Sequence, residues 1–269
     1  MKRSVFMISD GTGITVESLS NSLLSQFESI SFEKQIFPFI DTEQKAEQVC
    51  AKINQATGDQ KPLVFMTLVN PVLCEVIKKS SACVFDLFDT FLSPLEIELG
   101  TKASDTVGRA HAVANNERYT LRIDAVNYAL AYDDGIKIKG YEQADVILIG
   151  VSRCGKTPSC LYMALQFGVF AANYPFTDDD LSGYRLPEAL RAYKSKLFGL
   201  TIDPQRLQQI RTERRPNTPY SSAEQCRREV SNVEIMYKEE GIPYINSTTF
   251  SIEEIATKVM SIVKIERKI

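Results

Sequence analysis

The stretch DVILIGVSRCGKTPSCLYMALQFG, residues 145–168, runs from an apolar segment through a glycine-containing loop into a second apolar segment. Residues 150–157 match the pattern G-x-x-x-x-G-K-[ST] without a mismatch. The segment before the loop predicts a strand, and the segment after it predicts a helix. Small or apolar residues are expected to form the inward face of that helix: Leu161, Ala164, Leu165 and Gly168. A strand, loop and helix in this order predict an α/β domain with a phosphate-binding loop.

The glycines of this loop allow the backbone to curl, so that successive N–H groups point at phosphate oxygens and the helix start adds partial positive charge. Lys156 is expected to face solvent, to reach the outer phosphates and to act in catalysis, whereas the Thr157 hydroxyl is expected to hold Mg²⁺. The predicted nucleotide contacts are Gly150, Val151, Ser152, Arg153, Cys154, Gly155, Lys156 and Thr157. An ordinary glycine-bearing turn that contains Lys-Thr is the alternative.

Two further side chains each have two interpretations. Cys154 lies at a helix start beside a lysine, conditions that lower the pKa of a thiol, so it is either a nucleophile or a packing residue in a tight loop. Asp203 follows the apolar segment LFGLTI and is placed to order a metal ion and act in catalysis. Alternatively, Asp203 caps the helix that begins at Pro204.

A basic run, PQRLQQIRTERR, follows at residues 204–215. Its arginines are able to close over phosphate groups as a lid, with Arg211 and Arg214 as the phosphate contacts. A solvated helix face explains the same residues. The run also contains Arg206 and Arg215.

The N-terminal part of the chain alternates strand and helix patterns as well. Residues 5–9, 32–40 and 62–69 predict strands with helical segments between them, which indicates a mostly parallel sheet covered on both sides. A polar segment of small residues, 101–116, separates this part from the rest. We therefore expect two domains: a Rossmann-like parallel α/β domain over residues 1–104 and a P-loop kinase-like α/β domain over residues 105–269.

The segment SDGTGIT, residues 9–15, places two glycines at a strand-to-helix junction, where exposed N–H groups favour an anion. The candidate phosphate contacts are Asp10, Gly11, Thr12 and Gly13. The third glycine of a dinucleotide fingerprint is missing, and an ordinary tight turn is the alternative. The Asp10 carboxylate would repel phosphate unless it is paired or coordinates a cation.

His111 lies in the polar connection and is the only histidine of the chain. An imidazole is the side chain whose unperturbed pKa lies near neutrality, so His111 is a candidate catalytic residue. The alternative is an ordinary exposed loop histidine.

The composition limits the partners. The 269 residues are 44% apolar and 24% charged, with a net charge of -3, which predicts a globular protein with no overall attraction for nucleic acid or acidic lipid. Six cysteines without a CxxC spacing and a single histidine argue against a zinc site and for free thiols, and no apolar run is long enough to cross a membrane. We expect a cytoplasmic protein. No N-K-x-D pattern follows the loop, which disfavours a GTPase and leaves an adenine nucleotide.

Six segments of the chain resemble sequences of the family of bifunctional regulatory proteins that act on phosphoenolpyruvate synthetase and on pyruvate, phosphate dikinase. They are ISDGTGIT near the start, RIDAVNYALAYDDG at 122–135, GVSRCGKTP from 150, AANYPF at 171–176, LFGLTIDPQRLQQIRTERR at 197–215 and INSTTFSIEEIA at 245–256. The resemblance covers essentially the whole chain, and LYMALQFGVFAANYPF is closer to the synthetase branch. Asn127 and Tyr132 depart from the family pattern, which often has an acidic residue and a histidine there.

The resemblance implies an ADP-dependent serine/threonine kinase that inactivates its target by phosphorylating a threonine beside the target's catalytic, phosphorylated histidine. It also implies the reverse process, in which inorganic phosphate removes the phosphoryl group and pyrophosphate is released. The implied cofactors are ADP and inorganic phosphate, with Mg²⁺ as the expected metal. The implied partner is phosphoenolpyruvate synthetase, with the dikinase as the alternative target, and a homodimer is one open form of assembly.

A base for the threonine hydroxyl is expected at Asp203 or within residues 178–180. Two other functions also fit the loop. One is a small-metabolite kinase, and the other is a non-enzymatic adenine-nucleotide sensor.

Overall fold

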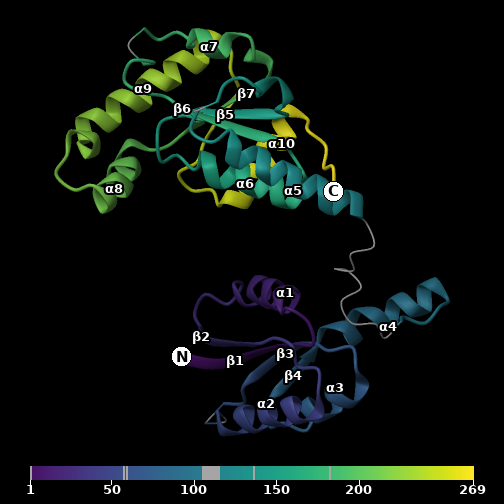
Figure 1. The fold of residues 1–269 in the computed structure, drawn as a ribbon. Helices are drawn as coiled ribbons and strands as arrows, with labels where there is room; N and C mark the ends of the chain where they lie inside the picture. Colours follow the sequence, from purple (N-terminus) through teal and green to yellow (C-terminus); the bar gives the residue numbers. More distant parts are fainter. Residues whose placement is uncertain (1, 57, 59, 105–115, 136, 182) are drawn as a thin grey trace. The chain divides into compact units, whose positions relative to one another are not determined.

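A computed structural model describes residues 2–269 apart from 57, 59, 105–115, 136 and 182 (Figure 1). The chain divides into two compact units, residues 1–112 and 113–269, each with its own four-stranded parallel sheet. The predicted α/β fold is therefore confirmed. The expected boundary after residue 104 lies at the edge of residues 105–115, outside the described residues, and each unit is described by itself below.

The first unit has the strand order β2-β1-β3-β4. Its strands are β1 (Lys2–Ser9), β2 (Ser31–Phe37), β3 (Leu63–Thr67) and β4 (Cys83–Asp86), and its helices are α1 (Ile14–Leu24), α2 (Glu43–Gln55), α3 (Pro71–Lys78) and α4 (Leu87–Leu99). Successive residues of a strand face opposite sides of the sheet. Phe6 and Ile8 accordingly pack with α2 and α3, whereas Val5 and Met7 pack with α1 and the start of α4.

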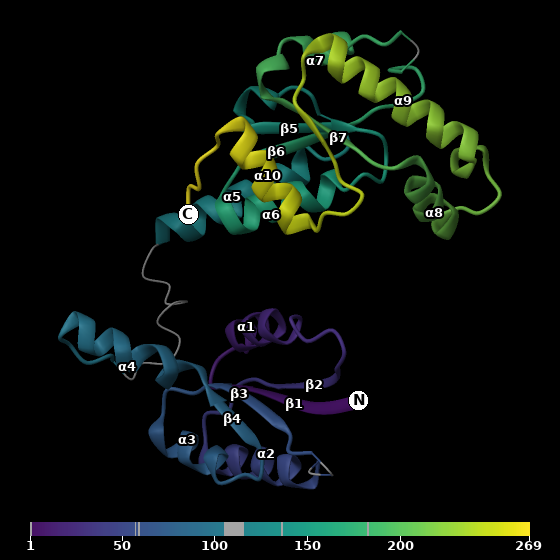
Figure 2. The same cartoon turned by 180° about the vertical axis from the view of Figure 1, so that it is seen from behind.

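The second unit has the strand order β6-β5-β7-β8. Its strands are β5 (Val146–Gly150), β6 (Ala171–Pro175), β7 (Leu197–Thr201) and β8 (Tyr244–Asn246). Its helices are α5 (Asn116–Ala131), α6 (Lys156–Phe167), α7 (Glu188–Arg191), α8 (Pro204–Arg214), α9 (Ala223–Glu240) and α10 (Ile252–Val263), with 3-10 turns η2 (Tyr141–Gln143), η3 (Lys194–Lys196) and η4 (Pro219–Ser221). Helices α5 and α10 pack on α6 at one face of the sheet, and α9 packs on β7 at the other face (Figures 1 and 2).

Both sheets share one topological feature. The first strand of each unit lies inside the sheet, because the chain adds its second strand on one side and its third strand on the other. The carboxyl end of that first strand is where open α/β sheets bind their ligands. The predicted glycine-containing loops, residues 10–13 and 150–155, follow β1 and β5 at these two points.

Candidate functional site

The backbone of the loop after β5 is shaped by three residues with positive φ: Gly150 at 153°, Arg153 at 79° and Gly155 at 93°. A Cβ atom at Gly150 would lie 2.4 Å from the carbonyl oxygen of Leu200, so no other residue fits there. Gly155 is the N-cap of α6 and offers no side chain to the first amides of the helix. Arg153 adopts a left-handed conformation that costs energy for a non-glycine residue, and such strain is concentrated at functional sites.

Lys156 lies inside this loop. Its side chain is only 5% exposed, and its Nζ atom donates to the carbonyl oxygens of Gly150 at 3.0 Å and Val151 at 2.8 Å. The expectation that this lysine faces solvent is wrong, because the curled loop presents two carbonyl groups that bind the ammonium group. The loop thus contains a positive charge, as a site for a polyphosphate requires.

Thr157 begins a second group of polar contacts. Its hydroxyl donates to Oδ1 of Asp133 at 2.9 Å, and the side-chain amide of Asn173 donates to the same carboxylate oxygen. Asn173 is buried on β6, and its Oδ1 accepts from the backbone N–H of Asp134 at 3.2 Å. Asp133, just beyond the end of α5, is therefore held beside the hydroxyl that the sequence assigns to the metal.

These oxygen ligands fit a hard cation such as Mg²⁺, which prefers carboxylate and hydroxyl oxygens. Among the described residues, no group of three or more His, Cys, Asp or Glu side chains is gathered to hold a metal by itself. Mg²⁺ is commonly bound by one or two protein ligands together with substrate phosphates and water. The pair formed by Thr157 and Asp133 thus suits a metal that arrives with a nucleotide.

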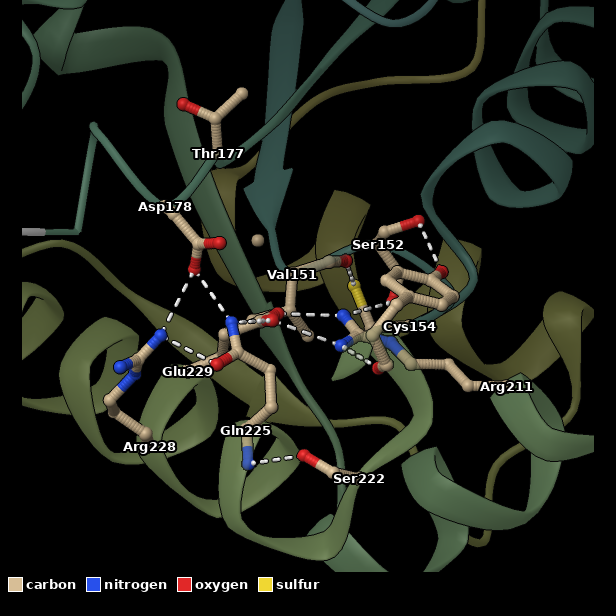
Figure 3. A network of polar contacts seen from close by, with 12 residues as sticks. Val151, Ser152, Cys154, Thr177, Asp178, Arg211, Ser222, Gln225, Arg228 and Glu229 are labelled. Carbon is tan, nitrogen blue, oxygen red and sulfur yellow. Dashed lines mark hydrogen bonds and ion pairs between the residues drawn. The ribbon is translucent and has the colours of Figure 1, made fainter. Parts of the chain in front are cut away.

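Arg211 on α8 connects the loop to a buried ion pair (Figure 3). The guanidinium, in a side chain that is 1% exposed, donates to both carboxylate oxygens of Glu229, at 3.0 Å and 2.6 Å. It also donates to the backbone carbonyl groups of Tyr220, at 3.1 Å, and Ser152, at 3.3 Å. Burial lowers the pKa of Arg211, but the contact with Glu229 more than offsets this, so the pKa lies above its ordinary value.

Comparison with known proteins identifies the family of the chain. A family model described as "Kinase/pyrophosphorylase" matches residues 5–260. The chain belongs to the kinase/pyrophosphorylase family. Three relatives carry the printed name "Putative phosphoenolpyruvate synthase regulatory protein". They come from Legionella pneumophila strain Corby (66% identical, covering 100% of both chains), Hahella chejuensis (54%, 100% of both) and Pseudomonas fluorescens strain Pf0-1 (53%, 100% of this chain and 99% of the relative).

In this member of the kinase/pyrophosphorylase family, Asp203 has the contacts of a helix cap. Its Oδ1 accepts from the backbone N–H groups of Gln205 at 2.9 Å and Arg206 at 3.0 Å. The carboxylate that contacts Thr157 is that of Asp133 instead. The helix-cap interpretation of Asp203 is thus confirmed, and its metal-ordering and catalytic roles stay predictions.

Helix α8 places the arginines of this run in different environments. The alternative that Arg211 lies on a solvated helix face is wrong, because α8 turns this side chain inward to Glu229. Its phosphate contact stays a prediction. Arg214, in the last turn of α8, is exposed, and its phosphate contact stays a prediction.

The thiol of Cys154 is buried and donates to the carbonyl oxygen of Val151 at 3.1 Å. Burial raises the pKa of this thiol, although the nearby Lys156 opposes the shift. A raised pKa reduces the thiolate fraction that a nucleophile needs. The contacts of Cys154 are therefore those of a packing residue.

The predicted bases at residues 178–180 already have partners. Asp178 accepts from the side chain of Gln225 at 2.6 Å and lies 3.5 Å from Arg228. Asp180 accepts from the hydroxyl of Thr177 at 2.8 Å and is contacted by Tyr174. Their role as the base stays a prediction.

The loop after β1 is also stabilised by local contacts. Asp10 accepts from the backbone N–H of Val69 at 2.7 Å, and the amide of Gly11 donates to the hydroxyl of Ser9. Gly13, with φ of 82°, is the N-cap of α1, and Thr12 is exposed. Burial raises the pKa of Asp10. The predicted phosphate contacts of this loop stay a prediction.

His111 lies outside the described residues, so its catalytic role stays a prediction as well. Within the part of the chain that the structure describes, none of the helices has the length and apolar character that crossing a bilayer requires.

Proposed function

We propose that this chain is an ADP-dependent serine/threonine kinase and a phosphate-dependent pyrophosphorylase that inactivates and reactivates phosphoenolpyruvate synthetase through one threonine. The observation that carries the proposal is the buried Lys156, held inside a loop that leads into the start of α6 without a side-chain cap. Membership of the kinase/pyrophosphorylase family supports the pairing of the two activities. The relatives' printed name supports the synthetase as the target.

The loop residues 150–157 would bind the diphosphate of ADP through their backbone N–H groups. Lys156 is able to leave its two carbonyl partners for phosphate oxygens at low cost, because each carbonyl keeps another donor. The Gly150 oxygen also accepts from the N–H of Phe176 at 3.0 Å, and the Val151 oxygen accepts from Cys154. A buried ammonium group next to the transferring phosphoryl group stabilises the charge of the transition state.

Thr157 and Asp133 would hold Mg²⁺ together with phosphate oxygens of the nucleotide. When bound, the ion supplies positive charge that offsets the charge on the phosphoryl oxygens. Asn173 keeps the Asp133 carboxylate in place through its side-chain amide. A carboxylate held by a neighbouring donor is pre-organised for its ligand.

In the kinase direction, the threonine oxygen of the target forms a bond to the β-phosphorus of ADP. The bond from that phosphorus to the bridging oxygen breaks, AMP leaves, and the hydroxyl proton passes to a base. In the reverse direction, an oxygen of inorganic phosphate attacks the phosphothreonine, pyrophosphate forms and the threonine oxygen regains a proton. Both reactions need an anion site beside the loop, so one site can serve both.

The decisive experiment incubates the full chain with ADP labelled in the β-phosphoryl group, Mg²⁺ and purified synthetase in its histidine-phosphorylated form. Label on a threonine of the synthetase, followed by its release as pyrophosphate when inorganic phosphate is added, is the expected result. Label on a small metabolite instead would identify a small-metabolite kinase, and binding of ADP without transfer would identify a sensor. Pyruvate, phosphate dikinase is the parallel target, and Lys156→Met is the inactive control.

A further inference from the structure

A buried ion pair joins Arg211 of α8 to Glu229 of α9, next to the loop at residues 150–157 (Figure 3). Tyr220 of η4 packs against it. Arg211 and Glu229 form a two-pronged contact, and the guanidinium carbon lies 4.1 Å from the centre of the Tyr220 ring. Removing one partner of such a pair would leave the other charge buried and unpaired, which is strongly unfavourable. The two side chains therefore hold each other in one geometry.

Two hydrogen bonds join this cluster to Ser152 in the loop. Nη2 of Arg211 donates to the Ser152 carbonyl oxygen at 3.3 Å, and the hydroxyl of Tyr220 donates to the Ser152 Oγ at 3.2 Å. The contacts span 59 and 68 residues of sequence, respectively. Both the backbone and the side chain of Ser152 are thus held by elements that lie far along the chain.

The backbone contact determines where a loop amide points. In a planar trans peptide, the C=O and N–H groups point in opposite directions. Because the Ser152 carbonyl group points to Arg211, the N–H of Arg153 in the same peptide points away from Arg211. The contact also supports the left-handed conformation of Arg153, with φ of 79°. Loop amides of this kind are the groups that contact phosphate.

We propose that Arg211, Glu229 and Tyr220 are positioning residues that hold the peptide between Ser152 and Arg153 in its phosphate-binding orientation. The proposal rests on the proposed function for the identity of the nucleotide. We name the three residues the loop latch. The competing account is that Arg211 leaves Glu229 and binds a phosphate itself. The two accounts predict different effects of Glu229→Gln on nucleotide affinity. If the loop latch exists, the variant binds nucleotide more weakly; if Arg211 is released to bind phosphate, the variant binds as tightly or more tightly.

The first test measures amide hydrogen exchange of the full chain without any nucleotide. Tyr220→Phe keeps the ring on Arg211 and removes only the hydroxyl contact with Ser152. The double variant Arg211→Met with Glu229→Leu replaces the ion pair by apolar side chains, a change that buried pairs often tolerate. Both are expected to speed exchange within residues 150–157, by about tenfold in the double variant. The matched control is Arg227→Gln, at an exposed position on α9. Unchanged exchange in both variants overturns the latch.

The second test measures ADP binding by calorimetry in the presence of Mg²⁺. The expected losses of affinity are about tenfold for Glu229→Gln and about threefold for Tyr220→Phe. Combining Tyr220→Phe with Ser152→Ala is expected to weaken binding no further than either change alone, because both remove the same contact. A merely structural role would lower the melting temperature but not the affinity of the folded molecules.

The outcomes separate the two proposals. Glu229→Gln protein that binds ADP as tightly as the unaltered chain, or more tightly, overturns the latch in favour of a released Arg211. Unaltered chain that binds no ADP overturns the proposed function instead, and the exchange measurement then still decides whether the latch exists.

Discussion

The loops after β1 and β5 occupy the same position in two sheets of the same strand order. Each leads to a helix whose N-cap is a glycine with positive φ, Gly13 in the first unit and Gly155 in the second. The side chains in the two loops differ in charge. The loop after β5 encloses the ammonium group of Lys156, whereas the loop after β1 contains the carboxylate of Asp10, bound to a backbone N–H of Val69.

The difference teaches that the fold supplies a helix start without a side-chain cap at both points, whereas the neighbouring side chains decide what binds there. The ionised carboxylate of Asp10 repels a phosphate, whereas the buried ammonium group of Lys156 attracts one. The loop after β5 also has the hydroxyl of Thr157 with a carboxylate partner in Asp133. The proposed nucleotide site therefore lies in the second unit, and we expect changes there to dominate activity.

The sharpest test of this assignment is Lys156→Met, which keeps the length of the side chain and removes its charge. Phosphoryl transfer is expected to fall by about 10³-fold or more, equivalent to about 4 kcal/mol. The melting temperature is expected to fall by only a few degrees, because the loop carbonyls keep their other donors. Transfer of labelled phosphoryl groups and circular dichroism measure the two effects. Transfer within tenfold of the unaltered chain would reassign the phosphoryl site.

Alanine at the two loop glycines compares the backbones directly. Gly150→Ala places a Cβ 2.4 Å from a backbone oxygen that cannot move aside, so we expect a loss of about 3 kcal/mol in the stability of the second unit. At Gly13→Ala, the Cβ would lie 3.2 Å from a side-chain methyl group of Ile36 and 3.8 Å from the Cβ of Pro38. The main cost is then the positive φ, about 1 kcal/mol in the first unit.

Denaturant unfolding, with hydrogen exchange to assign each transition to its unit, measures both losses. Gly155→Ala is the control for φ alone, because its nearest neighbour would lie 3.7 Å away. Equal losses for Gly150→Ala and Gly13→Ala would show that the two loops are built alike.

A weaker effect is expected at Asp133. Asp133→Asn keeps the shape of the side chain and removes its charge, which should lower transfer by about 30-fold, or about 2 kcal/mol, and raise the Mg²⁺ concentration needed for half activity. Asp203→Asn is the matched control, because asparagine caps a helix as well as aspartate. Transfer kinetics at several Mg²⁺ concentrations show which of the two variants, Asp133→Asn or Asp203→Asn, loses more activity. If Asp203→Asn shows the larger loss, the metal-ordering acid is Asp203 after all.

The sequence predicted the parts of this site that are local in the chain. The loop pattern names Lys156 and Thr157 as candidates, and the alternating apolar segments predicted both parallel sheets. The contact between Asp133 and Thr157 was not predicted, because DDG after a helix looks like a helix stop and the contact spans 24 residues. The inward turn of Arg211 was equally out of reach, since only the packing of α8 on α9 brings it to Glu229.

The smallest effect is expected from Asp10→Asn in the loop after β1. Asparagine keeps an oxygen that accepts from Val69 and removes a charge that burial disfavours. Because the folded pKa of Asp10 lies above the model-peptide value of 3.8, the unfolded chain loses this proton at a lower pH than the folded chain. The contribution of Asp10 to stability therefore falls as the pH rises from its unfolded pKa to its folded pKa, and it is constant above the folded pKa. We call this pH range the window.

Asp10→Asn should consequently stabilise the first unit at neutral pH, by less than about 1 kcal/mol, and show no gain below the window. Exchange rates of the β3 amides at pH 3 to 7, corrected for intrinsic rates, measure the gain, and phosphoryl transfer is expected to stay unchanged. A loss of stability at neutral pH would mean that the carboxylate is favourable in the folded loop. A cation or a donor group would then bind beside Asp10, and the charge contrast between the two loops would no longer hold.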